Sequence, residues 1–461
     1  MTIHNSTAEL DKAAHLHPYT NARKLEAEGP RVMAQGDGVY VRDAQGNEYI
    51  EGLAGLWSVA VGFGQQRLVD AAAQQMAQLP YYHVFAQKTH GPAARLADKL
   101  VEMTPEHLTK VFFTNSGSEA NDTVIKLIWF LNNALGRPGK KKFIARTGGY
   151  HGITIASGSL TGLPWNHAGF DLPAIPVRHV TTPHAYFFAN DGESEEQFAQ
   201  RLADEIEAVI QEEGPDTIAA FIGEPLIGAG GVLVPPAGYW EKVQAICKKH
   251  DILLIADEVI TGFGRTGKMF ACETFGITPD FMVLSKQLTS SYQPLAAIMM
   301  TDAIYQTIAD HSEKLGTLGH GFTGTGHPVA TAVGLENLAI IEEQNLVENA
   351  AAMGRVLRAE LARFADHPLV GEIRGEGLIA AVQLVADKAT RTRFDPEGKL
   401  GAYVFERAHD HGLIIRNIKD AIAFCPPLII TEDQVREMVS RFAATLDDTL
   451  AYARAEGMVA G

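Results

Sequence analysis

A lysine and an aspartate that each close an apolar stretch could form the centre of a reactive site. Lys286 follows the run FMVLS directly, and Asp257 ends the run ILLIAD. Both runs have the length and composition of a buried strand. A charged group at the end of such a strand is costly unless it meets an opposite charge or a strong hydrogen-bond partner. We therefore expect Asp257 and Lys286 to belong to one charged site.

Two arrangements would satisfy this pair. The simpler one is a direct ion pair, since the stretch between Asp257 and Lys286 is long enough for one crossover between neighbouring parallel strands. In the other, a cofactor lies between them: Lys286 forms a Schiff base with its aldehyde, and Asp257 neutralises a ring nitrogen on its far side. Such a cofactor is pyridoxal 5′-phosphate (PLP). The two residues alone do not decide between these arrangements.

Small and aromatic residues after other apolar runs could hold the rest of such a cofactor. Ser116, Gly117 and Ser118 follow KVFFTN and open a helical pattern, where free backbone N–H groups could bind a phosphate. These residues are also ordinary helix caps. Tyr150 in TGGYHG offers a flat ring to cover the cofactor, although it could equally be a packed aromatic. A bound PLP gives all of these residues one joint role.

The elements that position these residues alternate between apolar runs and amphipathic patterns. The runs KVFFT, KKFIAR, TIAAFIG, ILLIAD and FMVLS are separated by stretches such as EANDTVIKLIWFLNNAL and PAGYWEKVQAICKKH. This alternation predicts right-handed crossovers and an α/β fold with a large, mainly parallel sheet. Ligands bind at the carboxyl ends of the strands in such sheets, which is where the residues above lie.

The two ends of the chain have patterns of their own. GVYVRDAQGNEYIEGLAG predicts a hairpin with its turn at 44–47. Towards the C-terminus, PVATAVGLENLAIIEEQ predicts a helix, RGEGLIAAVQLV and AIAFCPPLIIT predict strands, and EDQVREMVSRFAATLDDTLAYARA predicts a closing helix. We expect a large domain over residues 80–325. The segments 1–79 and 326–461 would together form a smaller α/β domain.

Composition excludes several classes of partner. The chain has 461 residues, 46% of them hydrophobic and 20% charged, and a net charge of −16 without any basic block. This balance argues against binding to nucleic acid or to an anionic membrane. Three scattered cysteines predict neither disulfides nor a metal site. No signal-peptide pattern or long apolar run is seen, so we expect a cytoplasmic protein.

A series of motifs resembles the class III (omega) aminotransferases in order and spacing. The motifs are NSGSEAND, GGYHG, GEP with GAGG, ADEVITGFGRTG, SKQLTSSYQPLAA and HGFTGTGHPVA, and they cover nearly the whole chain. LAGLWSVAVGFG and IIRNIKDAIAFCPPLIIT are similar to the branch that transfers amino groups from amines, diamines or ω-amino acids to pyruvate. The resemblance implies the PLP-dependent fold type I. It also implies a homodimer with shared active sites, which could pair into a tetramer.

The resemblance also implies the role of individual residues towards PLP. Lys286 matches the Schiff-base lysine and Asp257 the partner of the ring nitrogen. The other matching positions are Ser116, Gly117 and Ser118 at the phosphate, Tyr150 and Val259 on the two ring faces, His151 beside Tyr150, Glu224 on the ring-hydroxyl side, and Thr323, which the neighbouring subunit would place at the phosphate.

Substrate-facing positions follow from the same resemblance. Trp57 and Phe85, with Tyr150, match aromatic walls of the substrate pocket, and Ala229 matches a small position near it. Arg416 matches a mobile arginine that holds the carboxylate of pyruvate, a task suited to a planar guanidinium. By residue type alone the two aromatics could be core residues and the arginine a solvated strand end.

Three positions depart from the family pattern. Gln287 and Ser291 stand where small residues or glycine are usual, and Gly324 stands where a side chain often lines the pocket. Gln287 is therefore expected to crowd the lysine loop, and Gly324 to widen the pocket.

The predicted activity is a two-half-reaction, ping-pong transfer of an amino group to pyruvate, giving alanine. Lys286 would act as general base and acid, so the site must lower its pKa from the ordinary value of about 10.4. The alternatives are a glutamate and 2-oxoglutarate pair, or another PLP reaction such as that of an aminomutase or a decarboxylase. A PLP-binding protein without activity is a further alternative.

Overall fold

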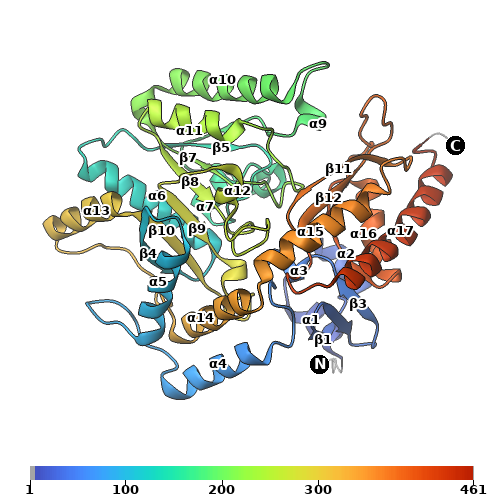
Figure 1. Ribbon diagram of the computed structural model, residues 1–461, viewed down its shortest axis with the longest axis horizontal. Helices are drawn as coiled ribbons and strands as arrows, with labels where there is room; N and C mark the ends of the chain where they lie inside the picture. The colour runs from blue at the N-terminus through green and yellow to red at the C-terminus, as the bar shows by residue number, and fades with distance from the viewer. Residues whose placement is uncertain (1–5, 460–461) are drawn as a thin grey trace.

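The computed structural model describes residues 6–459 of the chain. In this range the strands form three sheets, of seven, four and four strands. The seven-stranded sheet lies in one half of the molecule, and the two smaller sheets lie in the other half with the C-terminal helix α17 (Glu432–Ala455) (Figure 1).

The large sheet is the one that carries the predicted strand ends. Its order is β4 (Leu108–Thr114), β10 (Ala296–Thr301), β9 (Phe281–Leu284), β8 (Leu253–Asp257), β7 (Ile218–Gly223), β5 (Lys142–Arg146) and β6 (Val177–Val180). From β9 to β6 all neighbours are parallel, which confirms the predicted α/β fold. Strand β10 is antiparallel to β4 and β9. Sequence reasoning does not predict β10, because no α-helix separates it from β9 and it falls outside the alternation of strands and helices.

Helices cover both faces of this sheet. Ile255 of β8 belongs to the core formed with α6 (Gly117–Ala134) and α13 (Asp302–Leu315). The neighbouring Leu254 faces the core that includes α10 (Glu195–Glu213) and α11 (Tyr239–Lys249). Successive side chains of a strand point to opposite faces, so a purely apolar strand satisfies both cores.

The two smaller sheets join the ends of the chain. One has the order β1 (Met33–Asp37), β2 (Tyr40–Asp43), β3 (Glu48–Glu51) and β13 (Leu413–Ile414), and β3 pairs with β13 in parallel. The other contains β11 (Val370–Glu376), β12 (Ile379–Leu384), β15 (Ala421–Phe424) and β14 (Arg416–Ile418). The hairpin around 44–47 is therefore confirmed. The domain borders at 79/80 and 325/326 stay a prediction.

The strand predicted over AIAFCPPLIIT is too long. Strand β15 ends at Phe424, and Pro426 and Pro427 follow shortly after it. Proline has no N–H to donate to a neighbouring strand, so the ladder stops there.

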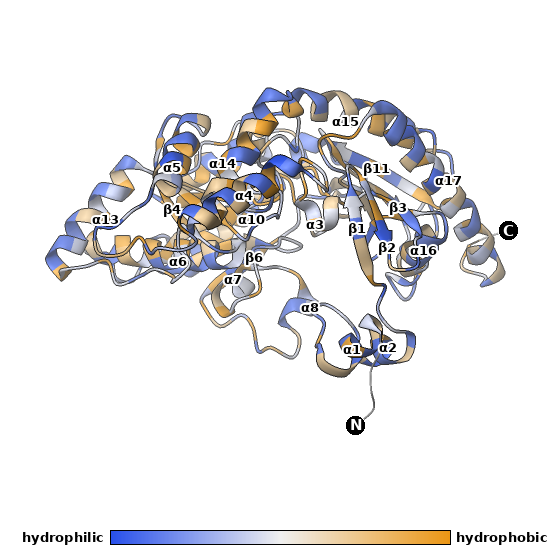
Figure 2. Cartoon of the chain, turned by 90° about the horizontal axis from the view of Figure 1, so that it is seen from below, coloured by the Kyte–Doolittle hydropathy of each residue, from blue (hydrophilic) through white to orange (hydrophobic). Residues whose placement is uncertain are grey.

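The remaining helices connect these sheets. They are α1 (Thr7–Ala14), α2 (Ala22–Glu28), α3 (Ala54–Trp57), α4 (Gln66–Gln78), α5 (Gly91–Met103), α7 (Ile155–Leu160), α8 (Pro164–His167), α9 (Ala185–Phe188), α12 (Ala271–Phe275), α14 (Pro328–Glu343), α15 (Leu346–Ala362) and α16 (Lys399–Asp410). Short 3₁₀ turns occur at Pro215–Thr217 and Lys286–Leu288. Figure 2 shows α1, α2 and α8 together on one side of the molecule. Within residues 6–459, none of the helices has the length and apolarity needed to cross a bilayer.

Candidate active site

Lys286 and Asp257 come together at one edge of the large sheet. Asp257 is the last residue of β8 and pairs in register with Val283 of the neighbouring parallel strand β9. Lys286 follows shortly after β9 ends. Both residues line a cavity of about 260 Å³ at the carboxyl ends of these strands. The sheet topology thus brings the two predicted charged groups to one cavity.

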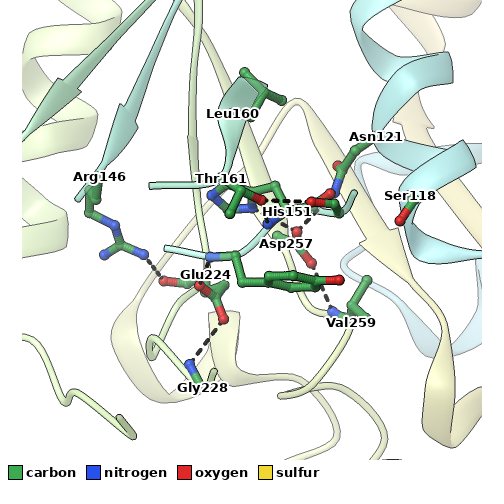
Figure 3. Close-up of polar contacts among 12 residues, drawn as sticks. Ser118, Asn121, Arg146, His151, Leu160, Thr161, Glu224, Gly228, Asp257 and Val259 are labelled. Atoms are coloured by element: carbon green, nitrogen blue, oxygen red, sulfur yellow. Dashed lines mark hydrogen bonds and ion pairs between the residues drawn. The ribbon is translucent and has the colours of Figure 1, made fainter. Parts of the chain in front are cut away.

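Asp257 is held by neutral donors and a histidine. Its Oδ2 accepts hydrogen bonds from Nδ1 of His151 at 2.8 Å and from Nδ2 of Asn121 at 3.0 Å (Figure 3). Its Oδ1 accepts one from the backbone N–H of Val259 at 3.2 Å. Among the described residues no ion pair joins Asp257 to Lys286, and His151 and Asn121 are the side chains that contact the Asp257 carboxylate. Of the two arrangements that the sequence left open, the direct Asp257–Lys286 ion pair is therefore not the one found among the described residues.

Asn121 is a site residue that sequence reasoning missed. It lies in α6, one turn after the helix start, and its Nδ2 also donates to the backbone oxygen of His151 at 2.7 Å. It stands in the quoted motif NSGSEAND, and residues one turn apart on a helix share a face. That spacing could have placed Asn121 on the side of Gly117.

Lys286 is half-buried and its amine has no hydrogen-bond partner among the described residues. Loss of hydration in the cavity lowers the pKa of this amine from its ordinary value, while Asp257 and Glu224 oppose the change. Its backbone has a φ of 46°, in the left-handed region that costs roughly 1–2 kcal/mol for a residue with a Cβ. The site therefore holds an amine with a raised neutral fraction in a strained loop.

The N-terminus of α6 forms an anion site at one end of the cavity. Ser116 caps the helix, and its hydroxyl accepts from the backbone N–H of Glu119 at 3.2 Å. The N–H groups of Gly117 and Ser118 come next, where a helix has no internal acceptor for them. A Cβ at Gly117 would lie 3.3 Å from a methyl carbon of Val259, so a side chain there would narrow the cavity. A phosphate fits this end.

Glu224 fixes the loop that carries Tyr150. Its Oε2 accepts from the backbone N–H of Tyr150 at 3.0 Å, and its Oε1 accepts from the N–H of Gly228 at 2.9 Å (Figure 3). The buried Arg146 donates to the backbone oxygen of Glu224. Burial raises the pKa of the Glu224 carboxyl. Tyr150 and Val259 both line the cavity that Glu224 borders.

A second cavity, of about 540 Å³, adjoins the first. The two share Leu56, Tyr150, Ile260 and Lys286 in their walls. Trp57, Ala229 and Arg416, three of the predicted substrate residues, line only the second one. Loss of hydration lowers the pKa of the Arg416 guanidinium, and Tyr19 and Tyr150 oppose this change. An amine bound in the second cavity would meet Lys286, because Lys286 lines both cavities.

Tyr19 and Trp165 also line the second cavity, and sequence reasoning missed both. The Tyr19 hydroxyl accepts a hydrogen bond from Nδ2 of Asn166 in α8 at 2.5 Å. This contact joins the N-terminal segment to α8. No local pattern predicts it, because Tyr19 stands in a polar stretch far from the strand ends.

Phe85 and Thr323 lie away from Lys286 within the single chain. Phe85 is 44% exposed and lines a different cavity near Gly321. Thr323 is exposed, and its backbone oxygen accepts from the hydroxyl of Tyr81 at 2.9 Å. The two predicted positions therefore share one region of the surface, and their predicted roles would need a second chain.

The structure shows the surroundings of the three residues that depart from the family pattern. Gln287 is fully buried and its amide faces the loop at 260–262, so it does not line either cavity. Ser291 has a φ of 58°, a conformation that favours glycine. A Cβ at Gly324 would lie 2.5 Å from Oδ1 of Asn115, so a larger residue there would require the Asn115 side chain to shift.

The donor set fits PLP. A buried carboxylate, an amine without a hydrogen-bond partner and an open helix N-terminus surround one cavity, with Tyr150 and Val259 in its wall. These features match a ring nitrogen, an aldehyde, a phosphate and a flat ring respectively. Together with the parallel sheet, they define a transferase of the PLP-dependent fold type I.

Comparison with known proteins identifies the family. The family model "Aminotransferase class-III" matches residues 23–446, so the chain belongs to the class III aminotransferases, which are PLP-dependent transaminases. Gamma aminobutyrate transaminase 3, chloroplastic, of Solanum lycopersicum is 47% identical over 94% of this chain and 84% of the relative.

Solved structures are also similar. The omega transaminase from Pseudomonas jessenii in complex with PMP is 62% identical, with a TM-score of 0.96 over 97% of this chain and 99% of that one. A structure described as a transaminase with L-ala is 58% identical, with a TM-score of 0.90 over 91% of this chain and 99% of the other.

Proposed function

We propose that this aminotransferase moves an amino group from an amine, a diamine or an ω-amino acid to pyruvate, giving alanine in a ping-pong reaction. The observation that carries this proposal is the guanidinium of Arg416, which has no ion-pair partner among the described residues and lies in the wall of a largely apolar cavity next to Lys286.

The charges of this cavity favour a monocarboxylate acceptor. Besides Lys286, the described cations in its wall are Arg416 and Lys419. Nζ of Lys419 is already paired with Oε2 of Glu397 at 2.6 Å. Arg416 therefore remains to bind one carboxylate through paired hydrogen bonds. 2-Oxoglutarate would bring a second carboxylate for which this wall offers no free cation.

The rest of the wall suits the carbon chain of an amine donor. Trp57, Leu163, Trp165 and Ile260 supply apolar surface, and Ala229 leaves room between them. Burying apolar surface stabilises a bound alkyl or aryl group by about 25 cal/mol per Å². Arg416 would bind the carboxylate of an ω-amino acid but has no partner in a simple amine, so the donor range depends on its mobility.

Similar proteins support both halves of the proposal. The relative from Solanum lycopersicum is named for γ-aminobutyrate, an ω-amino acid. An omega transaminase variant described as engineered for enantiopure bulky amines carries replacements of a tryptophan, a phenylalanine and an arginine. Their spacing along the chain is that of Trp57, Phe85 and Arg416, which supports substrate roles for these three.

The residues of this chain would divide the work at bound PLP, which supplies an electron sink for the carbon that loses its proton. Asp257 would keep a proton on the ring nitrogen, supported by His151 and Asn121. The Lys286 amine, with its lowered pKa, would take a proton from the substrate carbon and pass it to the cofactor. Ser116, Gly117 and Ser118 would hold the phosphate, and Tyr150 and Val259 would orient the ring.

We also propose a homodimer that completes each site. Phe85 and Thr323 lie on one exposed region of the chain, and neither lines the two cavities that meet at Lys286 in its own chain. In a dimer the Phe85 ring would wall the substrate cavity of the other subunit, and Thr323 would donate to the phosphate there.

A donor and acceptor screen tests the proposed reaction. The holoenzyme would be incubated with 4-aminobutyrate or an apolar amine, each with pyruvate or 2-oxoglutarate, and the amino acid products quantified. We expect alanine from pyruvate at a rate at least about tenfold above glutamate from 2-oxoglutarate, because the second carboxylate lacks a partner. Faster glutamate formation would contradict the acceptor proposal. Carbon dioxide release or isomerised donor without alanine would point to a decarboxylase or an aminomutase.

A further inference from the structure

Gln287 lies directly after Lys286 and joins two loops of the candidate site. We propose that Gln287 is a positioning residue whose amide fixes the lysine loop against the loop that follows Asp257. The proposal rests on the assignment of Lys286 as the lysine that binds PLP. It predicts that the amide group, and not merely the size of the side chain, determines how the chain binds the cofactor.

The amide of Gln287 uses both of its N–H groups on the opposite loop. Its Nε2 donates to the backbone oxygen of Ile260 at 2.7 Å and to that of Gly262 at 3.0 Å. The side chain is fully buried. Its Oε1 has no donor among the described residues, and turning the amide over would place this oxygen against two carbonyl oxygens. The observed orientation is therefore the only favourable one.

The loop that Gln287 contacts carries part of the cavity wall. Val259 and Ile260 follow Asp257 and line the first cavity with Lys286. Ile260 lines the second cavity as well. The hydrogen bond from Gln287 to the backbone of Ile260 consequently links the lysine loop to another part of the wall of the same cavity.

A second amide holds the lysine loop from the other side. Nδ2 of Asn337, in α14, donates to the backbone oxygens of Gln287 at 2.7 Å and Leu288 at 3.1 Å. Its Oδ1 accepts from the Ser290 hydroxyl at 2.6 Å. The same hydroxyl accepts from the N–H groups of Ala60 and Val61. The lysine loop is thus bound on two sides by buried hydrogen bonds.

The hydrogen bonds of Gln287 and Asn337 hold a lysine loop whose backbone is strained. Lys286, Ser290 and Ser291 all have positive φ, at 46°, 49° and 58°. A residue with a Cβ keeps this conformation only where its surroundings enforce it. We infer that loss of the Gln287 amide lets the loop relax and admits water to the amine of Lys286.

The amine of Lys286 reports on this change. Loss of hydration lowers its pKa, and the charged or titratable groups that face it are Asp257, Glu224, Cys425 and Arg416. A looser loop would return the pKa towards its ordinary value, since hydration favours the protonated amine. A variant that only destabilises the fold would leave this pKa unchanged.

The test compares Gln287→Met with the control Gln75→Met. Gln75 lies in α4, is buried, and donates from Nε2 to the backbone oxygen of Leu79 at 3.1 Å, and it lines neither cavity. The apo form of each variant would be recombined with PLP across a pH series. The PLP dissociation constant and the rate of appearance of the visible absorbance band would be measured.

For Gln287→Met we expect PLP binding weaker by at least about tenfold, and a rate profile whose midpoint moves to higher pH. Gln75→Met should stay within about twofold in affinity and keep the wild-type midpoint. A Gln287→Met protein equal to wild type in both measurements would overturn the proposal, as would an equal shift in the control.

Gln287→Glu provides a second variant of nearly the same shape in case the methionine protein does not fold. Its carboxyl donates at most one hydrogen bond, and only when protonated. We expect PLP binding between wild type and the methionine variant in acid, and weaker binding as pH rises. Wild-type affinity at every pH would overturn the proposal.

These measurements need no amine donor or keto acid. Failure to form alanine would therefore contradict the proposed function and leave the recombination result standing. If Lys286→Ala still gave the visible band with PLP, the assignment of the lysine itself would fail.

Discussion

The two cavities that meet at Lys286 are built in different ways. The smaller one is formed by the ends of neighbouring strands and the start of α6, and buried hydrogen bonds fix its carboxylate on both oxygens. The larger one collects residues from distant segments, among them Tyr19, Trp57 and Arg416. The smaller cavity, proposed for PLP, thus rests on one sheet edge, while the larger cavity, proposed for substrates, depends on how both chain ends pack against it.

This difference predicts that cofactor binding and substrate choice vary separately. A change at a strand end should affect every reaction of the enzyme. A change in the larger cavity should alter which substrates react while leaving PLP in place.

The largest effect is expected from removing the amine at the junction. Lys286→Ala should abolish the visible absorbance band of the bound cofactor and lower kcat by more than about 10⁴-fold, because the one other described amine in these walls, that of Lys419, is paired with Glu397. Absorbance spectra and alanine formation measure this. Full turnover of the variant would contradict the central assignment.

Asp257→Asn should have the next largest effect. An amide cannot stabilise a protonated ring nitrogen as a carboxylate does, so kcat should fall by about 10²–10³-fold with every donor. The effect should be equal for pyruvate-dependent and donor-dependent half-reactions, measured by stopped-flow absorbance. A loss confined to one substrate would contradict a role at the cofactor.

Arg416→Ala should separate the two cavities. Losing a charged hydrogen-bond partner costs about 2–3 kcal/mol, so kcat/KM for pyruvate should fall roughly 30–150-fold. The half-reaction with an apolar amine and the PLP dissociation constant should change less than about threefold. Equal losses in both half-reactions would argue against Arg416 as the carboxylate site.

Glu51→Gln should change how the free energy of unfolding depends on pH. Glu51 accepts from the N–H of Leu53 at 2.9 Å, just before the turn that carries Trp57, and burial raises its pKa from 4.5 to about 8. Between these two values the folded chain keeps a proton that the unfolded chain loses, so wild-type stability falls as pH rises. The variant lacks this fall, so it should gain about 2–3 kcal/mol relative to wild type from pH 5 to 7.

Denaturant midpoints of both proteins at the two pH values would measure this gain. Parallel pH dependences would show that Glu51 does not carry the raised pKa.

The smallest effect is expected from Tyr19→Phe. It removes the hydroxyl that accepts a hydrogen bond from Asn166 and interacts with Tyr150, a loss of about 1 kcal/mol, so KM for amine donors should change about fivefold. PLP affinity should stay at the wild-type value. A change in PLP affinity comparable to that in KM would contradict the separation of the two cavities.

Much of the fold and of the cofactor region followed from local pattern. Apolar runs separated by amphipathic helices indicated the parallel sheet, and the residue that ends each run pointed to Lys286 and Asp257. Strand β10 was missed because no α-helix separates it from β9, so it falls outside the alternation of strands and helices that indicated the other strands.

The sequence by itself determined which reactive groups end which strands, because strand direction and length are encoded in neighbouring residues. Only the tertiary structure decided that Asn121 and His151, rather than Lys286, bind Asp257. It also decided that Tyr19 lines the larger cavity and that the Gln287 side chain points away from the smaller one. The physical reason is that these contacts join segments far apart along the chain. Their geometry depends on the packing of whole helices and strands, which the spacing of neighbouring residues does not predict.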